Sequence, residues 1–231
     1  MDPDPAAQPW CYPGRAATCS GLLDGDRFLP RASSELWHLA GDRSALVAVG
    51  SNGSPAVLYR KLARHGVVGR VPLITGTLSG CAVGHSAHVS VPGFVAAAPY
   101  RARDAVSRVV VSLLDERQVA CLDRTEPNYV RRRLSPGGCV LDLEGGVRPA
   151  TFDLYDSRWG VLAPPGRPPL PFGSQEDLHA YLRGQWAAYL GLLGSGTARH
   201  AMHRLAADVD LRTRVREALA ATGWARPSGL E

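Results

Sequence analysis

Lysine, paired cysteine motifs and long apolar runs are scarce or missing in this 231-residue sequence. Its five cysteines form no Cys-x-x-Cys pair, and their odd number leaves one over in any disulfide scheme, so neither a zinc knuckle nor a secreted disulfide framework is indicated. No window approaches the roughly 18 apolar residues of a membrane-spanning helix. We therefore expect reduced thiols, a cytoplasmic location and no membrane partner.

Charge of one sign is not concentrated anywhere, although the formal net charge is +5. The densest basic cluster is Arg131-Arg132-Arg133, and the arginines near the C-terminus alternate with acidic residues. A nucleic-acid surface would need a basic patch or stripe, so we expect no nucleic-acid partner. Hydrophobic residues make up 45% of the chain and charged residues 20%, which is typical of a folded globular protein.

The first half of the chain predicts an irregular arm followed by a strand and a helix. Residues 1–42 are rich in Pro, Gly and Ala and show no sustained period, so we expect their isolated aromatics to anchor the arm on the core. These aromatics are Trp10, Tyr12, Phe28 and Trp37. A buried strand is predicted over 45–49, and Ser54-Pro55 begins a helix that runs to about Arg64.

The remaining pattern predicts an α+β fold in one domain. A helix is expected over 115–124, ended by Pro127, and two helices over 174–193 and 197–221. Further strands are expected over 70–78, 87–91, 94–98, 105–114, 131–134, 138–143 and 150–155, with a stiff proline-rich loop over 163–169. We divide the chain into an arm (1–42), a core (43–172) with a mixed sheet and flanking helices, and a helical extension packed on it (173–231).

The segment Val49-Gly50-Ser51-Asn52-Gly53-Ser54-Pro55 joins the end of a predicted strand to the start of a helix. Its glycines allow close backbone approach, and its N–H groups could face a carboxylate or phosphate. The segment lacks the Gly-Lys-Ser/Thr of a P-loop and the pattern of a dinucleotide site. The alternative is an ordinary glycine-permitted turn followed by a helix cap.

A second segment, Asp123-Arg124-Thr125-Glu126-Pro127-Asn128-Tyr129, places a glutamate just beyond a predicted helix end. A carboxylate on a rigid turn beside apolar strands is suited to general acid/base chemistry. Most glutamates at such positions are instead solvated or cap a helix. Asn128 and Tyr129 are candidates for lining a pocket, and Arg124 for steering an acidic substrate.

Together and in this order, the two segments resemble a known family. "AVGSNGSPAVLYRKL" is similar to the motif that opens the gamma-glutamylcyclotransferase-like fold, and "LLDERQVACLDRTEPNYVRRRL" resembles the later segment that supplies the family's catalytic glutamate. The resemblance covers roughly residues 46–155. Two positions depart from the family: Val49 replaces the usual aromatic residue, and Gly53 replaces the usual leucine.

This resemblance implies a small mixed barrel or sheet and a cofactor-free cyclotransferase, of the lyase or acyltransferase kind. Val49, Gly50, Ser51, Asn52, Gly53 and Tyr129 would bind a substrate with a free amino-acid head group, and Glu126 would be the general acid/base. The product would be 5-oxoproline with release of an amine, as in specialised metabolism. Alternatives are a related amide or acyl-transfer enzyme, or a non-catalytic ligand-binding or pathway accessory protein. A homodimer is a further expectation.

Other candidates are weaker. His85 and His88 have an odd spacing that would put them on opposite strand faces, and His200 and His203 lack an evident third ligand, so we expect no metal. Cys121 has the apolar setting of an inert thiol. Ser51 has no Gly-x-Ser-x-Gly surroundings, which favours a substrate-binding serine over a nucleophile.

Overall fold

The computed structural model describes residues 3–67, 69–135 and 137–230, so the predicted outer limits at residues 1 and 231 lie outside the described residues. The strands are β1 (Gly21–Asp24), β2 (Arg27–Pro30), β3 (Ser44–Ala48), β4 (Val71–Val89), β5 (Val95–Leu114), β6 (Tyr129–Leu134), β7 (Val140–Leu143), β8 (Phe152–Ser157), β9 (Val161–Leu162) and β10 (Ala225–Arg226). The helices are α1 (Ser33–Trp37), α2 (Pro55–Arg64), α3 (Glu116–Thr125), α4 (Gln175–Gln185), α5 (Tyr189–Leu193), α6 (Ala198–Ala207) and α7 (Val209–Ala221), with 3-10 turns η1 (Pro9–Cys11) and η2 (Ser51–Gly53).

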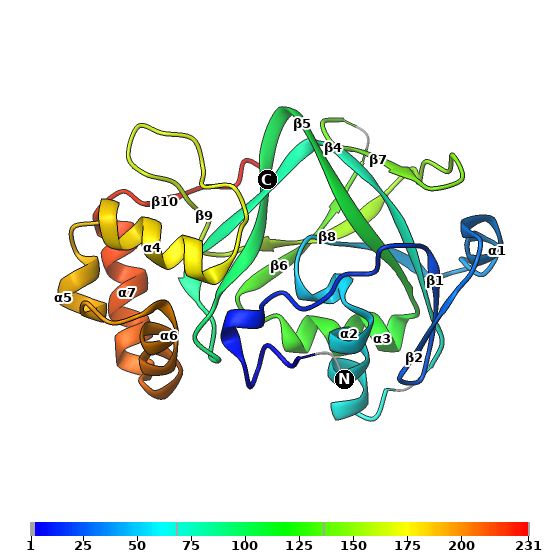
Figure 1. Cartoon of the computed structure of the whole chain (residues 1–231). Helices are drawn as coiled ribbons and strands as arrows, with labels where there is room; N and C mark the ends of the chain where they lie inside the picture. The colour runs from blue at the N-terminus through cyan, green and yellow to red at the C-terminus, as the bar shows by residue number, and fades with distance from the viewer. Residues whose placement is uncertain (1–2, 68, 136, 231) are drawn as a thin grey trace.

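The fold is α+β, as the pattern predicts: one mixed sheet with helices around it (Figure 1). The main strand order is β10-β9-β4-β5-β3-β8-β6, and β1 and β7 also pair with β4. β3 is antiparallel to β5 and parallel to β8, which makes the sheet mixed. α2 and α3 lie together on one side, where Leu58, Leu62 and Leu122 join the same buried cluster as Val110 of β5.

β4 and β5 form one long antiparallel hairpin where the sequence indicates four shorter strands. The prediction of breaks between 78 and 87 and between 98 and 105 is wrong. Gly80 and Gly84 interrupt the valine-rich pattern, yet they lie within β4. Gly80 has φ +80° at a register shift between Ser79 and Cys81. Such a bulge bends a strand without ending it, so the hairpin curves across the whole molecule (Figure 1).

The N-terminal arm is more regular than expected. β1 and β2 form a hairpin with a two-residue turn at Gly25-Asp26, β1 adds to β4, and α1 follows. The prediction of an irregular arm is therefore wrong for 21–37. Asp24-Gly25 between two apolar pairs is a hairpin signal, and Gly25 has φ +60° as such turns require.

The helical extension is divided more finely than its apolar periodicity indicates. The helix predicted over 174–193 ends at Gln185, where Trp186 takes an extended conformation and donates from its ring N–H to Thr222. The helix predicted over 197–221 is interrupted at Asp208, whose side chain accepts a bond from the Leu211 N–H and caps α7. In the described part of the chain, no helix combines the length and apolar character needed to cross a membrane.

The extension shares a hydrophobic core with the sheet. Its helices contribute Leu178, Tyr189 and Leu205 to a cluster that also contains Val95 of β5 and Leu162 of β9. In addition, the buried side chain of Gln175 accepts from the N–H of Val95 and donates to its carbonyl, so the start of α4 is joined to the start of β5.

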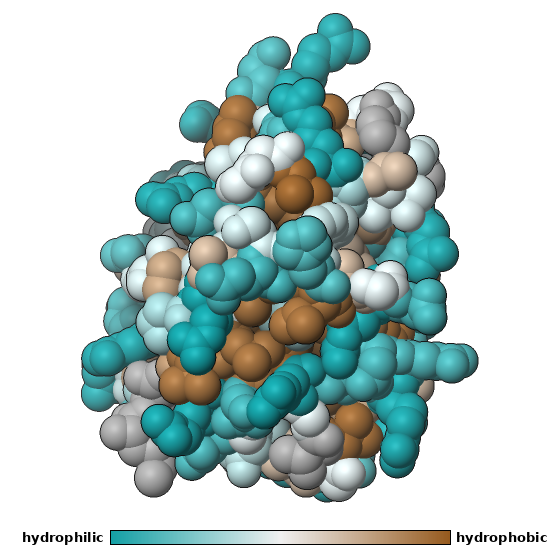
Figure 2. All heavy atoms as spheres, turned by 90° about the vertical axis from the view of Figure 1, so that its right-hand side faces the viewer, coloured by the Kyte–Doolittle hydropathy of each residue, from teal (hydrophilic) through white to brown (hydrophobic). Residues whose placement is uncertain are grey.

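The opposite side of the molecule carries α1, β1 and β2. Figure 2 shows apolar side chains gathered in the middle of this face and enclosed by hydrophilic ones. Leu39, just beyond α1, is 51% exposed. The homodimer stays a prediction.

Three histidines are buried in the neutral form, which predicts acid sensitivity. Burial lowers the pKa of His85, His88 and His179 to about 4 from 6.5. Between these two values the unfolded chain binds more protons than the folded one, so the free energy of unfolding falls as pH is lowered from about 6.5 to about 4. Each histidine contributes on the order of 3 kcal/mol to this loss. Urea unfolding at a series of pH values measures it.

His179→Leu is expected to flatten this pH dependence, whatever it does to stability at pH 7.5. His38→Ala, which changes an exposed histidine, should leave the dependence as in wild type. Equal stability of the wild type at pH 7 and pH 4.5 would contradict the prediction.

Candidate active site

A cavity of about 330 Å³ lies where four segments meet. They are the N-terminal segment, the turn between β3 and α2, the turn between β4 and β5, and the turn between α3 and β6. Of the predicted site residues, Val49, Gly50, Ser51, Asn52, Glu126 and Tyr129 line the cavity. Gly53 instead lines a second cleft. Asn128 lines the cavity, while Arg124 is exposed and does not.

The Gly-Ser-Asn turn has the expected place but a tighter form than an open cradle. The N–H of Gly53 bonds to the Gly50 carbonyl at 3.0 Å, and that of Ser54 to the Ser51 carbonyl at 3.1 Å, closing a 3-10 turn. The N–H groups of Ser51 and Asn52 make no bond within the turn; that of Ser51 is directed at the Tyr12 hydroxyl, and that of Asn52 can be offered to an anion. Ser54 occupies the N-cap of α2 as predicted, yet among the described residues its hydroxyl makes no cap hydrogen bond.

Tyr12 stands directly against this turn. Its hydroxyl oxygen accepts the N–H of Ala97 at 3.0 Å and attracts that of Ser51, and its ring stacks on Phe94 at 4.1 Å. A Cβ at Gly50 would lie 2.5 Å from this oxygen, so the close approach requires glycine. Burial raises the pKa of Tyr12, which keeps its proton available as a hydrogen-bond donor in the cavity. Val49 itself is not aromatic, but Tyr12 brings an aromatic ring to the same turn.

Glu126 is the C-cap of α3, with its side chain 14% exposed. The helix begins with a capping box between Asp115 and Gln118, and Pro127 follows its end. The N–H of Tyr129 bonds to the Glu126 carbonyl at 3.0 Å, which holds the turn into β6. The backbone around the carboxylate is thus bonded on both sides.

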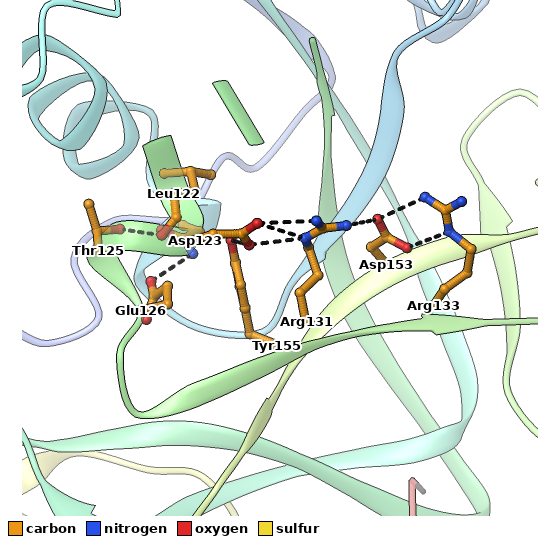
Figure 3. A network of polar contacts seen from close by, with 9 residues as sticks. Leu122, Asp123, Thr125, Glu126, Arg131, Arg133, Asp153 and Tyr155 are labelled. Atoms are coloured by element: carbon orange, nitrogen blue, oxygen red, sulfur yellow. Dashed lines mark hydrogen bonds and ion pairs between the residues drawn. The ribbon is translucent and has the colours of Figure 1, made fainter. Parts of the chain in front are cut away.

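A network of polar contacts supports the turn between α3 and β6 (Figure 3). The Asp123 carboxylate accepts from Tyr155 at 2.9 Å and from Arg131 at 3.0 Å. Arg131 also donates to Asp153, which is 2% exposed and accepts from Arg133. These bonds join the last turn of α3 to β6 and β8, so Arg131 of the basic cluster helps to orient the end of α3.

Lys61 completes the site, and sequence reasoning missed it. Its ammonium group donates to Glu126 Oε1 at 2.5 Å and to Asn52 Oδ1 at 2.8 Å, while Asn52 Nδ2 donates to the same Glu126 oxygen at 3.0 Å. Within the described residues, these are the side-chain hydrogen bonds that Glu126 and Asn52 make, and they link Lys61, Asn52 and Glu126 in a triangle. The available signal was composition, because Lys61 is the only lysine among 26 basic residues.

Tyr129 and His88 form the apolar side of the cavity. The Tyr129 hydroxyl donates to the Ala97 carbonyl at 2.8 Å, and burial raises its pKa well above the usual value. The His88 ring packs edge-on against Tyr129 at 5.8 Å, and its Nδ1 is 2.5 Å from the Ser86 hydroxyl. With its pKa lowered to about 4 by burial, His88 is neutral at pH 7.

The cavity rim is basic and partly covered by the N-terminal segment. Arg60 and Arg64 follow Val57 and Lys61 on the face of α2 that lines the cavity. The carboxylate of Asp4 is 3.3 Å from Arg64 and 3.7 Å from Arg60. A carboxylate of the chain itself thus lies at the entrance.

The remaining candidates lie outside the cavity. His85 accepts the N–H of Gly173, His203 packs against Trp10, and Cys121 is buried as predicted. Within the described residues, no group of three or more His, Cys, Asp or Glu side chains could hold a metal ion.

No protein-family model and no curated protein matches the chain. Solved structures that resemble it include the following two. One is a gamma-glutamyl cyclotransferase, at a TM-score of 0.39 and 11% identity, covering 75% of this chain and 98% of the other. The second is an uncharacterized protein from Homo sapiens, at 0.38 and 11%, with the same coverage. At these TM-scores neither likeness supports an argument about the site. The function of the site therefore has to follow from the contacts within this chain.

The contact between Gly50 and Tyr12 predicts that alanine lowers stability at one glycine of this turn and leaves it unchanged at another. Gly50→Ala would push a methyl group into the Tyr12 hydroxyl and should lower the free energy of unfolding by roughly 1–3 kcal/mol. Gly53→Ala is the matched control, because its nearest atoms would be 3.6 Å away. We expect the control to stay within about 0.5 kcal/mol of wild type. Denaturant unfolding of both variants decides, and equal losses would rule out the contact as the cause.

Proposed function

We propose that the chain is a cyclotransferase that acts on γ-glutamyl amides, releasing 5-oxoproline and a free amine, with Glu126 as general acid/base. The observation that carries the proposal is the triangle of Lys61, Asn52 and Glu126 at the cavity wall. All described hydrogen bonds to this carboxylate go to Oε1. Its second oxygen, Oε2, is therefore the atom that we assign to the substrate.

The substrate's head group fits the polar end of the cavity. Its α-carboxylate would bind the Asn52 N–H and the Tyr12 hydroxyl, which places the α-amine toward Glu126. The buried walls around Tyr129 and Phe94 exclude water from the side chain of the substrate. No cofactor is required, since both reacting atoms belong to one molecule.

The reaction is a proton transfer coupled to ring closure. Glu126 accepts a proton from the α-amine as its nitrogen attacks the γ-carbonyl carbon, and the same proton passes to the departing amine when the original amide bond breaks. Holding the amine and the carbonyl of one substrate together supplies much of the rate enhancement. Lys61 and Asn52 hold Oε1, so that Oε2 keeps its position through both transfers.

Glu126→Gln tests the acid/base role. The variant keeps the size of the side chain but cannot shuttle a proton, so we expect kcat to fall by roughly 10²–10⁴-fold. The measurement is 5-oxoproline by mass spectrometry over a panel of γ-glutamyl amides with neutral, basic and acidic leaving amines. Glu116→Gln, an exposed position of the same helix, serves as control and should keep full activity.

If the wild type binds members of the panel without forming 5-oxoproline, the chain is a ligand-binding protein on this fold. That outcome would refute the enzymatic proposal, and isothermal titration of the same panel detects it.

Lys61→Arg tests whether the triangle needs a compact ammonium group. A guanidinium keeps the charge, but its planar fork is larger and cannot occupy the same point between Asn52 and Glu126. We expect kcat/KM to fall by one to two orders of magnitude. Arg64→Lys makes the reverse change one helical turn later and should change kcat/KM less than about threefold. Comparable losses in both variants would mean that only the overall charge of α2 matters.

A further inference from the structure

Two buried thiols lie beside each other in the sheet, outside the cavity. Cys81 is in β4, directly after the bulge at Gly80, and Cys139 immediately precedes β7, which pairs with β4. Ser79 and Val140 are register partners in this antiparallel pair. Cys81 and Cys139 therefore lie on the same side of that pair, one on each chain segment. Both thiols are free and belong to the same buried cluster; the Cys81 thiol donates to the Ala82 carbonyl at 3.7 Å, and the Cys139 thiol donates to the Gly80 carbonyl, across the strand pair, at 3.8 Å.

An arginine is built into this thiol pair. Arg101 Nη1 is 3.5 Å from Cys139 Sγ, and the main chain of Arg101 is anchored by a 2.8 Å bond to the Ser228 carbonyl. A side chain at Gly138 would collide with this guanidinium, and one at Gly80 would collide with the Gly138 carbonyl. Glycine at positions 80 and 138 thus allows the two strands and the Arg101 side chain to approach the sulfur atoms closely.

The surroundings make the two thiols unequal. The neighbouring Cys81 thiol lowers the pKa of Cys139 to about 7, and Arg101 acts in the same direction against the effect of burial. The proximity of Cys139, together with burial, raises the pKa of Cys81. At neutral pH Cys139 is therefore partly a thiolate, which is the nucleophilic form, while Cys81 retains its proton.

We propose that Cys139 and Cys81 form a peroxide-reactive pair, in which Cys139 is the attacking thiolate and Cys81 the resolving thiol. The Cys139 sulfur attacks hydrogen peroxide, giving a sulfenic acid and hydroxide. The Cys81 sulfur then attacks the sulfenic sulfur, and the disulfide forms with loss of water. The two thiols lose two electrons and the peroxide gains them.

Access and geometry both support this pair. Cys139 is 2% exposed, but it directly follows the exposed Gly137 and Gly138, and Arg101 beside it is also exposed, so its sulfur lies close to the surface. Adjacent strands lie about 4.8 Å apart, within the range of Cα separations that a disulfide spans. Cys121 is equally buried, and burial raises its pKa. It is therefore the internal control.

The test uses the full chain carrying Cys11→Ser and Cys19→Ser, which removes the two more accessible thiols. The reduced protein is treated with hydrogen peroxide at pH 7, alkylated, digested and mapped by mass spectrometry. We expect a Cys81–Cys139 cross-linked peptide that has lost two hydrogens, while Cys121 remains alkylatable. In Cys81→Ala, dimedone should label Cys139. If that variant does not fold, the cross-link in the parent protein still decides.

Arg101→Gln adds a measurement that a purely structural role would not affect. Loss of the guanidinium should shift the pH dependence of Cys139 oxidation upward and slow it about fivefold at pH 7, corresponding to a shift of about one pKa unit, with recovery at pH 9. The proposal is overturned if Cys81 and Cys139 stay reduced, or if Cys139 reacts no faster than Cys121. Cyclotransferase activity is not needed for either result.

Discussion

The ion pair between Lys61 and Glu126 is the contact on which the candidate site depends. It joins two segments that are 65 residues apart, the middle of α2 and the end of α3, and Asn52 closes the triangle from the turn before α2. With side chains only 19% and 14% exposed, both charges have given up most of their hydration. Such a pair gains little net stability, whereas removal of one partner leaves a costly buried charge. Its position in a cavity therefore favours a chemical role.

The rest of the fold holds this pair in place. Asp123, Arg131 and Asp153 connect the last turn of α3 to two strands, so the backbone that carries Glu126 cannot shift without breaking charge-assisted bonds. On the other side, α2 packs its leucines into the same apolar cluster as α3. Rigid support of this kind is what a proton-shuttling carboxylate needs, because its efficiency depends on distances held to a fraction of an ångström.

The N-terminal segment belongs to the site and not only to the surface. Tyr12 contacts the Gly-Ser-Asn turn, and Asp4 lies between the arginines of the rim. An acidic ligand would meet the same arginines, so this segment covers a basic entrance to the cavity. These residues lie more than 35 positions before the turn in the sequence. The isolated aromatics predict that Tyr12 anchors the arm on the core, as it does, but not that it meets this turn.

Local chemistry in the sequence was sufficient for much of the secondary structure and for two of the site's three main groups. Pro55 and Pro127 set the start of α2 and the end of α3 through fixed backbone angles, and the two motifs identified Asn52 and Glu126. The break predicted within β4 was wrong because a glycine has the same local signature in a bulge as at a strand end. Only the partner strand distinguishes the two.

Lys61, Tyr12 and the thiol pair were decided by tertiary structure alone. A lysine at helical spacing is usually a solvated residue, and whether its ammonium group reaches a carboxylate depends on how α2 and α3 pack. The same holds for Cys81 and Cys139, whose contact depends on strand register. The sequence by itself determined which residues could carry the chemistry. The folded chain decided which of them meet, because contacts between distant segments depend on packing, which local propensity does not encode.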